Sequence, residues 1–214
     1  MTEPEYDAAI QYALNRLQEE LSPTLTYHNL WHTREDVMPA AERLACAYRL
    51  QPRQRGLLAV AAAYHDIGFL RQYDNHEQAG VEMITELLPR FGFGPEDIAC
   101  IAGCIRATRP LAQPENLLQA MLTDADLDVL GRDDFMTRGQ ALWAEVSAVL
   151  GLTSWESWLQ EQRAFLCRHR YRTVAGRTLR DEGKRRNIVL LEEQLRQNAV
   201  SLSEETLSGN VEDH

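Results

Sequence analysis

The segment that most constrains this chain is an apolar run that ends in two polar side chains. Residues 57–63 are all leucine, alanine or valine, and Tyr64, His65 and Asp66 follow directly. A run this apolar is unsuited to one face of a surface helix, so it carries an imidazole and a carboxylate into the protein interior. A charge at that position needs a partner, and both side chains are good metal ligands. The fold must therefore bring further polar side chains to this point.

The rest of the sequence favours helices. Apolar residues recur at helical spacing in the segments 4–21, 37–48, 52–66, 76–88, 96–106, 115–130, 134–150, 154–171 and 177–198. No segment shows a convincing alternation of apolar and polar residues, so we predict an all-α fold. We expect a single helical domain over residues 1–198. Residues 199–214 are acidic with few apolar side chains, which predicts a disordered tail.

Charge and hydropathy exclude some classes of function. The formal net charge of −10 argues against binding a nucleic acid polymer, because that binding depends on neutralising phosphates. No apolar run approaches the roughly 20 residues that a membrane-spanning helix needs. The first residues are acidic and polar, unlike a secretory signal peptide, so we expect a cytoplasmic protein without membrane contacts.

Four positions on separate predicted helices are candidate metal ligands: His32, His65 with the adjacent Asp66, and Asp126. Two neutral imidazoles and two carboxylates bind a divalent cation with near charge neutrality and leave positions for water and substrate. This mixed set suits Mn, Fe, Ni, Co, Mg or Zn, and it does not identify one of them. The helices that carry these residues must converge.

The order of these ligands resembles the H…HD…D signature of the HD superfamily of metal-dependent phosphohydrolases. The resemblance covers about residues 27–131 and includes the segments 27–32 (Tyr-His-Asn-Leu-Trp-His), 65–69 (His-Asp-Ile-Gly-Phe) and 126–131 (Asp-Leu-Asp-Val-Leu-Gly). It implies an HD-domain helical bundle with the metal site in that core, to which the helices expected from the residue pattern at about 134–198 add the C-terminal part. It also implies hydrolysis of a phosphomonoester or phosphodiester of a small metabolite or nucleotide by a metal-activated water.

Departures from the family pattern bear on the number of metal ions. Two-metal members of the superfamily have additional histidines and a lysine after the HD pair, but this chain has Phe69 there and no histidine in residues 105–109. We therefore expect one divalent ion per chain. The alternatives are a di-iron oxygenase of the HD type, which needs further ligands, and a non-catalytic module that binds a nucleotide.

Four further residues have two interpretations each. His28 is either a hydrogen-bonding residue of a turn or a catalytic group. His76 and Glu77 either begin a helix, with the acid at its positive end, or transfer protons. Asp124 either orients a metal ligand or is solvated. For Asp128, we expect a position at the surface.

A basic segment bears on the substrate. Between 162 and 186 lie eight arginines and one lysine against one aspartate and one glutamate, a net charge of +7. Such runs are often solvated helix faces, but some of these residues could instead clamp a phosphate. The candidates for phosphate contacts are Arg109, Arg172, Arg180 and Lys184, and the expected partner is a small phosphorylated substrate such as a nucleotide.

Overall fold

The computed structural model describes residues 4–151 and 154–208, with side chains through residue 199, and this part of the chain is all-α as predicted. Its α-helices are α1 (Tyr6–Glu20), α2 (Met38–Ala47), α3 (Pro52–Tyr64), α4 (His76–Leu87), α5 (Pro95–Ala107), α6 (Leu117–Asp126), α7 (Phe135–Leu150), α8 (Trp155–Arg168) and α9 (Val174–Ser208). A single π-helical segment, η1 (His32–Val37), leads into α2, and short 3-10 segments follow α3, α4 and α6: η2 (Ile67–Leu70), η3 (Leu88–Phe91) and η4 (Asp128–Gly131). None of the described helices is long and apolar enough to cross a membrane.

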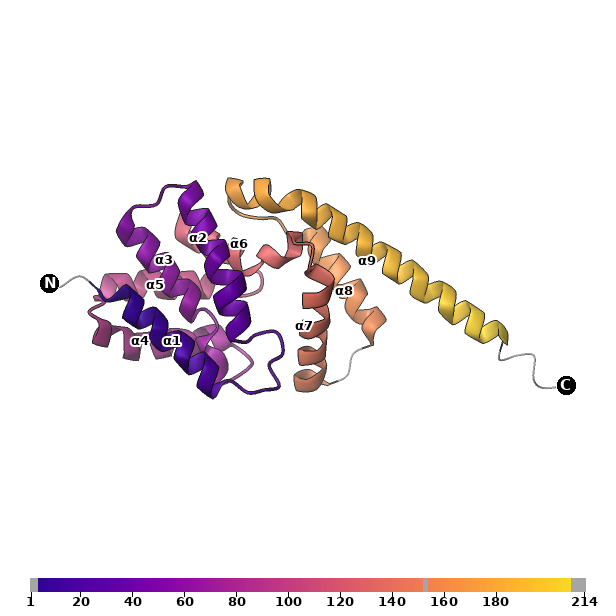
Figure 1. Ribbon diagram of the computed structural model, residues 1–214, viewed down its shortest axis with the longest axis horizontal. Coiled ribbons are helices and arrows are strands. Elements are labelled where there is room, and N and C mark those ends of the chain that lie inside the picture. Colours follow the sequence, from indigo (N-terminus) through magenta and orange to yellow (C-terminus); the bar gives the residue numbers. More distant parts are fainter. Residues whose placement is uncertain (1–3, 152–153, 209–214) are drawn as a thin grey trace.

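Helix α3 is the centre of the first hydrophobic cluster, which α1 to α6 build together (Figure 1). It packs against α1, α2 and α5, and the side chains from Val60 to Tyr64 are fully buried. The Tyr64 hydroxyl donates to the carbonyl of Ala9 in α1 at 2.9 Å, so the one polar atom of this apolar run has a partner. The metal-ligand candidates at the end of α3 therefore lie in the interior, as the sequence predicts.

The turn after α3 is fixed by a close backbone approach. Helix α3 ends at Tyr64, and Gly68 lies within η2. A Cβ atom at Gly68 would lie 1.8 Å from the carbonyl oxygen of His76 and 2.7 Å from the amide nitrogen of Gly80. Only glycine lets η2 approach α4 this closely, and this contact holds the start of α4 beside the His65–Asp66 pair.

The C-terminal helices form a second hydrophobic cluster beside the first. Helices α7 to α9 and η4 build it around Trp158, Leu159, Leu166 and Leu191. In Figure 1, α7 and α8 lie beside the α1–α6 bundle, and α9 runs diagonally along one side of the molecule and beyond it. Helix α9 continues through Ser208, so the predicted disordered tail does not begin at residue 199. The rest of that tail, residues 209–214, lies outside the described residues.

Candidate metal centre

His65 and Asp66 are delivered to the centre by the end of α3. His65 is fully buried and Asp66 is 5% exposed. The Nδ1 atom of His65 lies 2.8 Å from the carbonyl oxygen of Ala62 and must donate to it, because a carbonyl only accepts. In the neutral imidazole this leaves the lone pair on Nε2, the atom that faces Asp66 Oδ2 at 3.1 Å. The backbone thus sets the tautomer that a metal ligand requires.

His32 and Asp126 complete the cluster from η1 and the end of α6. His32 Nε2 lies 3.2 Å from Asp126 Oδ1 and 3.9 Å from Asp66 Oδ2, and His65 Nε2 lies 3.5 Å from the same Asp126 oxygen. Three potential ligand atoms, one each from His32, His65 and Asp66, lie within 4.8 Å of one another. These three residues could hold a metal ion. Asp126 is the most exposed of the four, with 21% of its side chain accessible.

The donor set fits a divalent cation. His65 Nε2 and Asp66 Oδ2 are buried and have no hydrogen-bond partner, which is costly unless another group satisfies them. Burial alone lowers the pKa of His65, but the carboxylates of Asp66 and Asp126 more than offset this and raise it well above its usual range. A ligating imidazole must be neutral, so a bound cation would compete with protons for these nitrogens.

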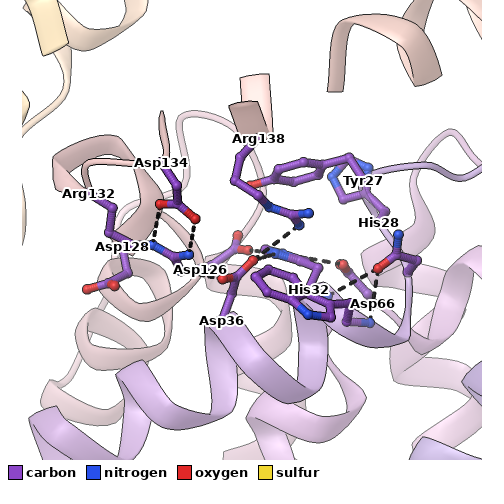
Figure 2. A network of polar contacts seen from close by, with 12 residues as sticks. Tyr27, His28, His32, Asp36, Asp66, Asp126, Asp128, Arg132, Asp134 and Arg138 are labelled. Atoms are coloured by element: carbon purple, nitrogen blue, oxygen red, sulfur yellow. Dashed lines mark hydrogen bonds and ion pairs between the residues drawn. The ribbon is translucent and has the colours of Figure 1, made fainter. Parts of the chain in front are cut away.

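A buried carboxylate lies behind His32. Asp36 Oδ2 is 3.5 Å from His32 Nδ1, and Asp36 also forms ion pairs with Arg132 and with Arg138, the latter at 3.2 Å (Figure 2). Such a carboxylate fixes the orientation of a ligating imidazole. The sequence analysis missed Asp36, although its position four residues after His32 on a helix is a signal that could have identified it.

His28 is held by a second buried carboxylate, Glu145 of α7. His28 Nδ1 and Glu145 Oε1 are 2.5 Å apart, and Glu145 Oε2 accepts the backbone N–H groups of Tyr27 and His28 at 2.8 and 2.9 Å. Glu145 is fully buried. Burial raises the pKa of Glu145, but the contact with His28 and the two N–H groups lower it overall, so Glu145 stays ionised. His28 lies in the loop before the helix.

The start of α4 brings another imidazole to the centre. His76 Nε2 lies 3.5 Å from Asp66 Oδ1, and the His76 ring stacks on Phe69 with centroids 3.8 Å apart. The Phe69 ring also stacks on the imidazole of His28, with ring centroids 4.7 Å apart. Glu77 is buried, and Arg109 Nε lies 3.7 Å from Glu77 Oε2. Among the four predicted phosphate ligands, Arg109 is the one that contacts a residue at the start of α4, namely Glu77.

Asp124 accepts hydrogen bonds from the segment between α8 and α9. Its Oδ1 accepts the backbone N–H of Arg172 at 2.6 Å, and its Oδ2 accepts the N–H and the hydroxyl of Thr173 at 2.8 and 2.7 Å. Both carboxylate oxygens are therefore occupied by this segment. These contacts explain the burial of Asp124 without the predicted role in orienting a metal ligand.

The other basic candidates have structural partners. Arg180 forms a bidentate ion pair with Asp128, at 2.7 Å through Nε and 2.8 Å through Nη2, and Asp128 is buried rather than at the surface as expected. Lys184 Nζ is buried and donates to the carbonyl of His169 at 2.7 Å. Arg172 Nη1 donates to the side chain of Gln113 at 3.1 Å. Arg172, Arg180 and Lys184 thus have partners within the protein, and these contacts connect α9 and the segment before it to neighbouring elements.

A cavity adjoins the candidate metal centre on the side of the second hydrophobic cluster. Its volume is about 280 Å³, and Asp126 and His28 lie in its wall. The remaining lining comes from the loop before η1 and from η4, α7 and α8, namely Tyr27, Leu127, Val129, Leu130, Phe135, Arg138, Gly139, Leu142, Gln162 and Phe165. The cavity therefore connects the candidate metal centre to the C-terminal helices.

Comparison with known proteins agrees with this arrangement. Residues 30–127 match the family model of the HD domain. The chain contains an HD domain. The fold is similar to that of the crystal structure of a predicted HD superfamily hydrolase from an uncultured Thermotogales bacterium, with a TM-score of 0.53 and 21% sequence identity over 77% of this chain and 88% of that one. No curated protein matches the sequence.

The HD domain supplies all four candidate ligands, whereas Glu145 and Arg138 come from α7 outside it. No motif or spacing in the sequence indicates a role for these two residues. Their partners lie more than 70 residues away in the chain, and their positions on α7 resemble those of ordinary polar residues on an amphipathic helix. The centre is thus assembled from the HD domain and one C-terminal helix.

Proposed function

We propose that this HD-domain protein is a metal-dependent phosphohydrolase that acts on a phosphomonoester or phosphodiester of a small metabolite. The observation that supports this most is the buried pair of imidazoles and carboxylates, with unpartnered Nε2 and Oδ2 atoms, beside a cavity. The relative with the same fold is described as a predicted hydrolase, which agrees with the proposal.

His32, His65, Asp66 and Asp126 would hold the ion, and we propose one divalent ion per chain. The chemistry that such an ion supplies is a lowered pKa of water and polarisation of a phosphoryl oxygen. The chain's own residues set up the site for it. The Ala62 carbonyl fixes the tautomer of His65, and the buried surroundings of the cluster strengthen every electrostatic interaction there.

His28 is the proposed proton donor to the leaving group. The ionised Glu145 accepts a hydrogen bond from His28 Nδ1 and orients the ring, while the same imidazole lies in the wall of the cavity. A positioned acid of this kind contributes about 10²- to 10⁴-fold to a reaction that expels an alkoxide. Glu145 acts through His28 and is therefore a positioning residue.

One observation favours a second candidate function. His76 Nε2 lies near Asp66 Oδ1, while His65 Nε2 lies near Asp66 Oδ2, so Asp66 has an imidazole beside each of its oxygens. A carboxylate between two ligand groups can bridge two ions, as in a two-metal hydrolase or a di-iron oxygenase. In the one-ion account, His76 instead orients Asp66 and Glu77 is held by Arg109.

Hydrolysis of p-nitrophenyl phosphate and bis(p-nitrophenyl) phosphate, measured with Mn, Co, Ni, Mg, Zn and Fe(II) in turn, tests the proposal. We expect turnover by the wild-type protein, none by Asp66→Asn, and wild-type turnover by Asp133→Asn, whose carboxylate is 95% exposed. Absence of turnover with every metal would contradict the proposed function. Nucleotide binding without turnover would then favour the non-catalytic module.

A further inference from the structure

Arg138 is the cationic side chain of the cavity. Of the described residues that line the cavity, it is the one arginine or lysine. It projects from α7 toward His32 and Asp36, with the Tyr27 ring beside it (Figure 2). The Arg138 guanidinium lies 4.8 Å from the centroid of the Tyr27 ring and 4.4 Å from that of Trp31. These two rings hold the guanidinium in place at the edge of the metal centre.

The guanidinium has unused hydrogen-bonding capacity. Its Nε atom is buried and makes no hydrogen bond, whereas Nη2 forms an ion pair with Asp36 Oδ2 at 3.2 Å. Asp36 is also paired with Arg132 in a closer contact, so Arg138 is not needed to neutralise it. A buried guanidinium N–H group without an acceptor is unfavourable, and an anionic oxygen bound beside Arg138 would provide one.

The rest of the cavity is suited to an apolar group. Most of its wall consists of aliphatic and aromatic side chains from η4, α7 and α8, including Leu130, Phe135 and Leu142. Gln162 is the one amide among the described lining residues. A nucleobase would bring several donors and acceptors to this wall and leave most of them without partners. The volume of about 280 Å³ is at the lower end of the range for small-molecule sites.

We propose that this cavity binds the substrate, that Arg138 binds its phosphoryl group, and that the substrate class is phosphomonoesters of compact, apolar alcohols rather than nucleotides. The proposal rests on the proposed function and adds the specificity of the same site. Arg138 and the ligands of the HD domain flank the phosphoryl group, and the apolar wall takes the organic group. His28, in the same wall, lies where the leaving oxygen departs.

Binding of non-hydrolysable phosphonates, measured by isothermal titration calorimetry on Mn-loaded protein, tests this directly. We expect phenylphosphonate to bind the wild-type protein at least 10-fold more tightly than methylphosphonate, and more tightly than 5′-AMP. In Arg138→Gln, we expect Kd for both phosphonates to rise about 10- to 100-fold, as for a lost charge-assisted hydrogen bond. Leu142→Asp should weaken phenylphosphonate binding and leave methylphosphonate binding nearly unchanged.

The control is Arg163→Gln on α8, because Arg163 is exposed and pairs with Glu192 away from the cavity. Unchanged phenylphosphonate binding in Arg138→Gln, or tighter binding of 5′-AMP than of phenylphosphonate to wild-type protein, would overturn the inference. The wild-type comparison stands even if Arg138→Gln folds poorly. Hydrolysis without the expected binding pattern refutes only this inference, whereas the expected binding pattern without hydrolysis refutes only the proposed function.

Discussion

Substitution of Glu145 by glutamine is the sharpest test of the link between α7 and the HD domain. Glu145 accepts two backbone N–H groups and the Nδ1 proton of His28, all within 2.9 Å, and its side chain is fully buried. Glutamine has nearly the shape of glutamate and keeps one acceptor oxygen. It removes the negative charge at position 145 and can place an amide NH₂ group beside the imidazole of His28. The main loss is one charge-assisted hydrogen bond, about 1.5–3 kcal/mol of unfolding free energy.

The expected effect on stability is a lower Tm, by about 2–4 °C for each kcal/mol lost in a chain of this size. The expected effect on activity is a fall in kcat with a small change in KM, because Glu145 orients His28 without contacting the substrate. Thermal unfolding and steady-state kinetics measure the two effects. Glu161→Gln, an exposed position on α8, is the matched control. Wild-type kcat in Glu145→Gln would refute the role of this pair.

Three other perturbations have defined outcomes. Gly68→Ala should destabilise the fold by about 1–3 kcal/mol or more, because its Cβ would overlap the carbonyl of His76, and a wild-type Tm would contradict that packing argument. Arg180→Gln should cost about 1–3 kcal/mol by leaving the buried Asp128 short of a partner, with KM unchanged; a raised KM would instead support a substrate contact. Burial, with the nearby cationic groups, lowers the pKa of His169 from 6.5 to about 4, so the unfolded chain binds its proton first as pH falls. Between about pH 6.5 and pH 4, the unfolding free energy of the wild-type protein should therefore fall by up to about 3 kcal/mol more than that of His169→Gln. Urea unfolding at several pH values measures both, and the same pH dependence in the two proteins would refute this.

The sequence was informative where function depends on local pattern. The apolar run before His65 predicted both the burial of the pair and its position at a helix end. Helical periodicity predicted each of the described α-helices, with boundaries that differ by a few residues, because amphipathic stripes and breakers such as Pro52 and Pro95 are local signals. The length of α9 was underestimated, because the polar composition after residue 198 also permits a helix.

The sequence was less informative where a side chain is used by a distant segment. Asp128 and Arg180 pair across the junction of η4 and α9, so an acid expected at the surface is buried and ion-paired. Glu145 and Arg138 reach the metal centre only because α7 packs beside the loop before η1. Such contacts depend on tertiary arrangement, which periodicity and composition do not encode for individual polar residues.

Metal content by plasma mass spectrometry tests the central claim most directly. The protein would be purified without chelator and measured beside the double variant His65→Ala/Asp66→Ala, with circular dichroism to verify that both are helical. The account predicts about one divalent ion per chain in the wild-type protein and none in the variant. Two ions per chain would contradict the one-ion assignment. No ion in the wild-type protein, even after reconstitution with manganese, would contradict the metal centre itself.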